Sequence, residues 1–81
     1  MNITVAKGEQ KNYIVNYVSD TIQNQVEHTV DSFLESVYAI GRLIHINDIH
    51  FEVPRELAGK VTSFLRVEYP GEIYEHKITV S

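Results

Sequence analysis

A long amphipathic pattern in the first half of the chain constrains the fold more than any other feature. Between Asp20 and Ile40, apolar residues recur at spacings of three and four, the period of an α-helix with one buried side. Ser19 and Asp20 can cap the start of this helix, and Gly41 can end it in the left-handed conformation. The pattern predicts one long helix. Its apolar positions are Ile22, Val26, Val30, Phe33, Leu34, Val37 and Ile40.

The segments around this helix alternate apolar and polar residues, which is typical of β-strands. A tight turn at Asn47-Asp48 joins two of them into a predicted hairpin. Pro54 suits the first position of a second helix, in which Leu57, Val61, Phe64 and Leu65 recur at helical spacing. The predicted strands cover residues 2–6, 11–18, 42–46, 49–53 and 73–80.

This order of elements predicts a small α+β fold. From residue 11 onward it is βαββαβ, the ferredoxin-like order, preceded by an extra N-terminal strand. We expect a two-layer sandwich in which an antiparallel sheet carries both helices on one face, and the length fits a single domain, 1–81. In an alternative reading the first helix runs on through Ile44, which removes one strand from the sheet.

Composition excludes several classes of function. The chain has no cysteine, and its eleven acidic and seven scattered basic residues give a net charge of -4. Direct binding to nucleic acid or to an anionic membrane needs clustered Lys and Arg, so neither is expected. Neither a basic leader followed by an apolar run nor a stretch of membrane-spanning length is visible. The sequence therefore predicts a cytoplasmic protein in a reducing compartment.

Motifs for catalysis are missing from the sequence. It contains no Gly-x-Ser-x-Gly elbow, and its four glycines lie too far apart for a phosphate-binding loop. We expect a non-enzymatic protein without cofactor or metal. As an alternative, His45, Asp48 and His50 are residue types that zinc and non-haem iron accept, and they would centre a small metal-dependent or acid–base enzyme. The odd spacing of the two histidines places them on opposite faces of a strand, which disfavours this reading.

Acidic residues gather on the polar side of the predicted long helix. Asp20, Glu27, Asp31 and Glu35 share that side with Tyr38, and carboxylates four residues apart stand roughly 6 Å apart along a helix axis. Such a row can meet Lys or Arg on a partner protein with a basic surface. The leading hypothesis is a regulator or inhibitor, of the kind that phages and other mobile elements use, which imitates nucleic acid towards a host nucleic-acid-handling enzyme.

Tyrosines supply a second candidate surface. Tyr13 and Tyr17 are four residues apart on one predicted strand and therefore share a face. Exposed tyrosines are enriched at protein interfaces, so this face predicts a contact patch that would also serve a homodimer. A structural or assembly subunit that self-associates through this patch or through a strand edge is the other alternative function.

Overall fold

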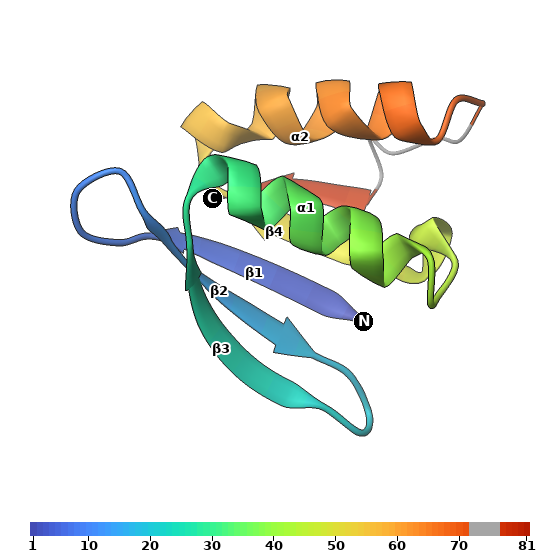
Figure 1. Cartoon of the computed structure of the whole chain (residues 1–81), viewed down its shortest axis with the longest axis horizontal. Helices are drawn as coiled ribbons and strands as arrows, with labels where there is room; N and C mark the ends of the chain where they lie inside the picture. Colours follow the sequence, from blue (N-terminus) through green and yellow to red (C-terminus); the bar gives the residue numbers. More distant parts are fainter. Residues whose placement is uncertain (72–76) are drawn as a thin grey trace.

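A computed structural model of the chain describes residues 1–71 and 77–81. Within these ranges it contains five strands, two α-helices and a short 3-10 helix at Ile46–Asp48 (Figure 1). The elements are β1 (Asn2–Lys7), β2 (Tyr13–Val18), β3 (Gln23–His28), α1 (Val30–Gly41), β4 (His50–Val53), α2 (Arg55–Glu68) and β5 (Ile78–Val80).

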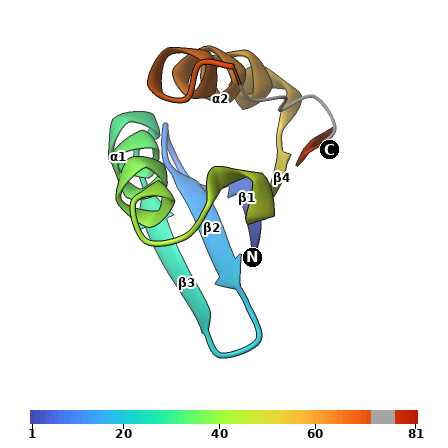
Figure 2. The same cartoon turned by 90° about the vertical axis from the view of Figure 1, so that its right-hand side faces the viewer.

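The five strands form one mixed sheet in the order β3-β2-β1-β4-β5 (Figure 2). The β1–β2 and β2–β3 pairs are antiparallel, whereas β4 runs parallel to both β1 and β5. The α+β class is confirmed, but the antiparallel sheet and the βαββαβ order are wrong. Because α1 carries the chain from β3, at one edge, across to the far side of β1, β4 enters the sheet parallel to β1.

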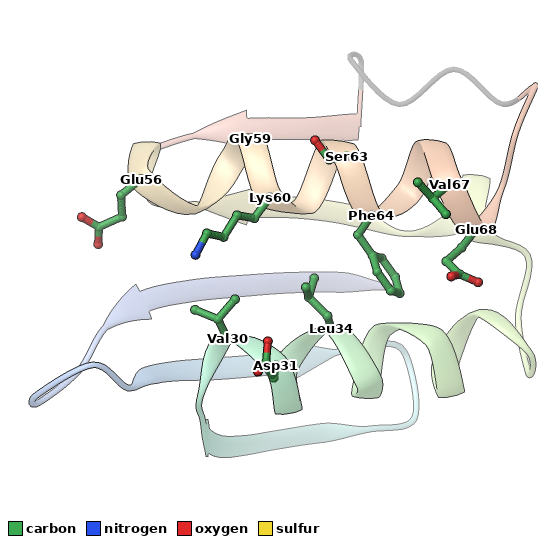
Figure 3. A pocket seen from close by; sticks show the side chains of 10 residues that line it. All are labelled: Val30, Asp31, Leu34, Glu56, Gly59, Lys60, Ser63, Phe64, Val67 and Glu68. Carbon is green, nitrogen blue, oxygen red and sulfur yellow. The ribbon is translucent and has the colours of Figure 1, made fainter.

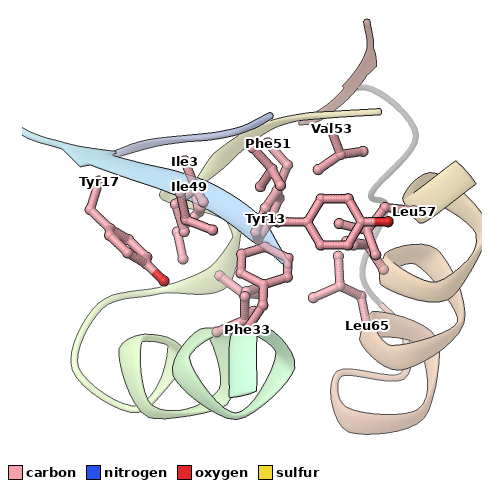
Figure 4. Close-up of a cluster of buried hydrophobic side chains, with 14 residues drawn as sticks. Ile3, Tyr13, Tyr17, Phe33, Ile49, Phe51, Val53, Leu57 and Leu65 are labelled. Atoms are coloured by element: carbon pink, nitrogen blue, oxygen red, sulfur yellow. The ribbon is translucent and has the colours of Figure 1, made fainter. Parts of the chain in front are cut away.

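The core lies between the sheet and the two helices, which occupy the same side of the sheet (Figure 4). In β1 and β2, Ile3 stands opposite Tyr17 and Val5 opposite Val15, so one face of both strands is buried. Each helix adds a stripe of buried side chains to this face. The buried helical residues are Phe33, Val37, Leu57, Val61 and Leu65.

The predicted long helix is wrong in its first half, because Gln23–His28 is a strand paired with all of β2. Ile22 and Val26 are four residues apart, a spacing that keeps two side chains on one side of a helix and also of a strand. The helix starts later. The Thr29 hydroxyl caps it by accepting from the Ser32 amide, 3.1 Å away.

The predicted hairpin after the helix is also wrong. Helix α1 ends at Gly41, and its C-cap, Arg42, is right-handed, so neither a left-handed Gly41 nor an extension through Ile44 is observed. Residues 42–45 form no strand, and the 3-10 helix leads into β4. Of the predicted last strand, residues 78–80 are extended as β5, and residues 72–76 lie outside the described part of the chain.

Candidate functional site

A groove runs between α1 and α2 on the side of the helices away from the core (Figure 3). Two overlapping cavities of about 790 and 570 Å³ make up this interhelical groove. Both helices begin at the same end of it, where Val30 and Glu56 lie (Figure 3). Its lining residues are Val30, Asp31, Leu34, Glu35 and Tyr38 of α1, and Glu56, Gly59, Lys60, Ser63, Phe64, Val67 and Glu68 of α2.

The floor of the interhelical groove is apolar. Three residues of this floor are partly buried: Val30, Leu34 and Phe64. One side of each packs against the core, and the other side faces the groove. On the rim, Val67 is 75% exposed and Tyr38 is 44% exposed. These two exposed side chains extend the apolar lining of the groove to its rim.

The walls of the groove are acidic. Four carboxylates line it, and Lys60 is the one basic residue among its described lining residues. At the end where both helices begin, Glu56 is already engaged: Lys7 lies 3.5 Å away and the Tyr13 hydroxyl donates to it over 3.3 Å. Asp31 lies in the first turn of α1, where a negative charge stabilises the helix dipole.

The opposite end of the groove combines two carboxylates with two aromatic rings, and we call it the acidic end. It is formed by Glu35, Tyr38, Phe64 and Glu68. Neither carboxylate is in a salt bridge in the ranges that the structure describes. Glu68 is the last residue of α2, where a negative charge opposes the helix dipole. Helix stabilisation therefore does not explain the acidic end.

Tyr69 follows Glu68 and caps α2, its backbone N–H donating to the carbonyl of Leu65 over 2.8 Å. Burial of its hydroxyl raises the pKa of Tyr69 above the ordinary value of 10.0, and the charges of Tyr38 and Glu68 raise it further. Tyr38 and Glu68 thus both act on the Tyr69 hydroxyl, and both also line the cavity at the acidic end.

Comparison with protein-family models, curated proteins and solved structures finds no match to this chain. In the described ranges, neither helix has the length and apolar character needed to cross a bilayer.

In the structure, the four carboxylates of the predicted acidic row do not lie together on one helix. Asp31, Glu35 and Tyr38 do share one face of α1, and all three line the groove. Asp20 lies in the turn between β2 and β3, and Glu27 lies on β3, where its carboxylate accepts from the Asn12 side chain over 2.7 Å. The prediction of one helical row of four carboxylates is wrong because residues 23–28 are extended.

Tyr13 and Tyr17 share a strand face as predicted, but that face is turned towards the helices. Their exposed fractions are only 6% and 7%, so the predicted surface patch of tyrosines is wrong. The two tyrosine rings fill space between the sheet and the helices, and only the hydroxyl of each ring needs a hydrogen-bond partner.

The Tyr17 hydroxyl has one partner at the end of β3 and another in the middle of α1. It lies 2.7 Å from Oγ of Ser36 and 2.9 Å from Nε2 of His28. The Ser36 hydroxyl can also donate to the carbonyl of Phe33, 2.7 Å away, so these groups form one hydrogen-bonded network. Burial lowers the pKa of His28, which favours the neutral ring in this network.

The histidine constellation does not assemble. His45 accepts from the amide of Asn47 over 3.2 Å, and His50 lies on β4, with Nε2 3.0 Å from the Thr79 hydroxyl. In the described residues, no group of three or more His, Asp or Glu side chains is placed to hold a metal ion. His45, Asp48 and His50 are therefore not placed to hold a metal ion together.

Sequence reasoning missed the α2 side of the groove. Phe64 was predicted as part of a buried stripe, whereas it is only partly buried and also faces α1. Val67 and Glu68 were not singled out. A usable signal was present in the sequence, because a Glu at the end of a helix and an apolar residue outside the stripe both depart from the ordinary pattern.

Proposed function

We propose that this protein is a non-enzymatic binding domain whose interhelical groove receives a basic amphipathic helix of a partner protein. One observation carries the proposal: an apolar floor continues into an acidic end where Glu35 and Glu68 have no salt-bridge partner in the described ranges. An amphipathic helix with apolar residues on one side and Lys or Arg beside them matches both features.

Backbone hydrogen bonding favours a helix as the ligand. Both walls of the groove are helices, whose backbone groups are paired internally except at the ends. An extended segment in this groove would find no backbone partners, and an unpaired backbone group costs free energy when it is buried. A helix satisfies its own backbone and needs only side-chain contacts.

The length of the groove and the charge of the protein further restrict which partner helix can bind. The groove's lining residues span 30–38 on α1 and 56–68 on α2, which is about 12 to 18 Å at a rise of about 1.5 Å per residue and fits roughly two to three turns of helix. The net charge of -4 adds long-range attraction for a basic partner.

A regulator or inhibitor of a nucleic-acid-handling enzyme remains a proposal consistent with this site, because such enzymes carry Lys- and Arg-rich elements. The contact proposed here differs from the one expected from the sequence. A regular row of carboxylates that imitates nucleic acid would require Asp20 and Glu27 on α1, and both lie elsewhere. The proposed contact is therefore a partner helix seated in the groove.

Calorimetry with a designed peptide tests the proposal. The probe is an amphipathic helix of about 14 residues with a leucine stripe flanked by arginines, and its matched control carries glutamates instead. We expect the arginine peptide alone to bind. The Glu35→Gln/Glu68→Gln variant should bind about tenfold more weakly, with a smaller dependence on salt.

Three further variants make this test specific to the groove. Glu52→Gln removes a carboxylate on the exposed face of β4 and should leave the affinity unchanged. Val67→Ser should weaken binding, whereas Leu43→Ser should not, since Leu43 is 84% exposed but does not line the groove. Equal binding of both peptides, or equal effects of the groove and control substitutions, would refute the proposed function.

Self-association through β3 is a second candidate function, and one observation favours it. β3 is an edge strand of six residues with neither Pro nor Lys, the residues that commonly block pairing between sheet edges. A second copy could add its own β3 in antiparallel orientation. Sedimentation of the protein and of a Val26→Pro variant tests this: a dimer lost in the variant supports it, and a monomeric parent protein excludes it.

A further inference from the structure

We propose that the acidic end of the groove is a binding site for a single arginine side chain of the partner helix. This inference rests on the proposed function and specifies the residue that anchors the helix. The site is the cavity of about 570 Å³ that Leu34, Glu35, Tyr38, Phe64 and Glu68 line together with Asp31.

The apolar part of this cavity suits the stem of a long side chain. Leu34 and Phe64 form its floor and stay partly exposed above the core (Figure 3). Arginine and lysine both bury an aliphatic stem along such a surface while the charged head remains at the rim. The floor by itself therefore selects a long side chain and does not decide its charge.

The carboxylates decide the charge. Glu35 lines the cavity from α1 and Glu68 lines it from α2, where its negative charge opposes the helix dipole. A cation bound beside Glu68 reduces this unfavourable interaction. Glu68 is 12 Å along the axis from Lys60, at about 1.5 Å per residue, so the chain's own groove lysine cannot occupy the site.

The aromatic rings favour arginine over lysine. Tyr38 and Phe64 present ring surface to the cavity, one from each helix. A planar guanidinium stacks on aromatic faces, is more weakly hydrated than an ammonium, and can bond one or two carboxylates through its five N–H groups. Two rings and two carboxylates around one cavity are therefore better matched to a guanidinium than to the compact, strongly hydrated lysine head.

Small arginine derivatives test the site without any helix. Acetyl-arginine amide is titrated into the labelled protein and followed by NMR, with acetyl-lysine amide and the neutral isostere acetyl-citrulline amide as matched probes. We expect the Tyr38 and Phe64 ring signals to shift with the arginine probe, with at least about a fivefold weaker response to lysine and none to citrulline. Equal responses to arginine and citrulline would overturn the assignment.

Variants connect the response to the cavity. Glu35→Gln, Glu68→Gln and Tyr38→Leu should each reduce the affinity for the arginine probe, and Glu52→Gln should not. Tyr38 is exposed, so its substitution leaves the core intact. A response to arginine that survives Glu35→Gln/Glu68→Gln would place the probe elsewhere and refute the site.

A peptide series separates this inference from the proposed function. Each arginine of the basic helix is replaced in turn by citrulline, and one position is expected to lose about tenfold in affinity while the others lose little. If every position loses equally, the groove proposal stands and the anchor fails. If the arginine amide binds but no basic helix does, the anchor stands and the groove proposal fails.

Discussion

Tyr69 packs so closely against Gly41 that a Cβ atom at position 41 would overlap the tyrosine hydroxyl. Gly41 is the last residue of α1 and Tyr69 caps α2, so this contact joins the ends of the two helices. It lies beyond the acidic end of the groove. The contact explains a glycine that the helix itself does not need, because the backbone at Gly41 is not left-handed.

Substitution of Gly41 by alanine tests this contact. Alanine ordinarily favours a helix by up to about 1 kcal/mol relative to glycine. Here the overlap with Tyr69 should reverse the sign and lower the free energy of unfolding by about 1 to 3 kcal/mol. Urea denaturation measures it. In a Tyr69→Leu background the same substitution should cost little, and an equal cost in both backgrounds would contradict the proposed contact.

Glu68→Gln should separate stability from binding. Removing a negative charge from the end of α2 should raise the free energy of unfolding by about 0.3 to 1 kcal/mol, while the affinity for the arginine peptide falls. The pKa of Tyr69 should also fall towards 10.0, because one of the charges that raise it is gone. Denaturation, calorimetry and an absorbance titration check these effects, and an unchanged stability would argue against the dipole effect.

The Tyr17 hydroxyl should contribute strongly to stability. Tyr17→Phe keeps the ring in the core but leaves Ser36 and His28 without their shared partner. The expected loss is about 1 to 3 kcal/mol in the free energy of unfolding. Tyr38→Phe is the matched control, because it removes the hydroxyl of an exposed tyrosine, and a similar loss in both variants would contradict this account.

The lowered pKa of His28 predicts how the free energy of unfolding depends on pH. Burial holds its pKa below the ordinary value of 6.5, so the unfolded chain takes up a proton first as the pH falls. The contribution of His28 is therefore fully present above pH 6.5 and is lost as the pH drops below it. Urea denaturation at several pH values should show this decline, and His28→Gln should reduce it. A decline of the same size in the variant would assign it to other groups.

Local sequence patterns predicted the elements whose apolar residues recur with the period of a strand or of a helix but not with both. Strand alternation identified β1, β2 and β4, and the stripe from Leu57 to Leu65 identified α2. β3 was missed because its one apolar residue, Val26, follows Ile22 by four positions, a spacing that fits a helix and a strand equally. The neighbours of β4 could not be predicted, since the pairing of β1 with β4 joins segments 48 residues apart and depends on where α1 lies.

The sequence was sufficient to predict the α1 side of the candidate site but not the α2 side. Asp31, Glu35 and Tyr38 share a helix face whether α1 begins at residue 20 or at residue 30, so the error in its start does not affect them. The α2 half could not be found in the same way, because only tertiary packing decides that Phe64, Val67 and Glu68 face α1.

NMR mapping of the bound arginine-rich helix shows which surface of the protein it occupies. The largest shift changes are expected at Leu34, Tyr38, Phe64 and Val67, with the sheet signals of β2 and β3 little affected. Shift changes concentrated on β3 or on the exposed face of the sheet, with the two helices unaffected, would show that the groove is not the binding site.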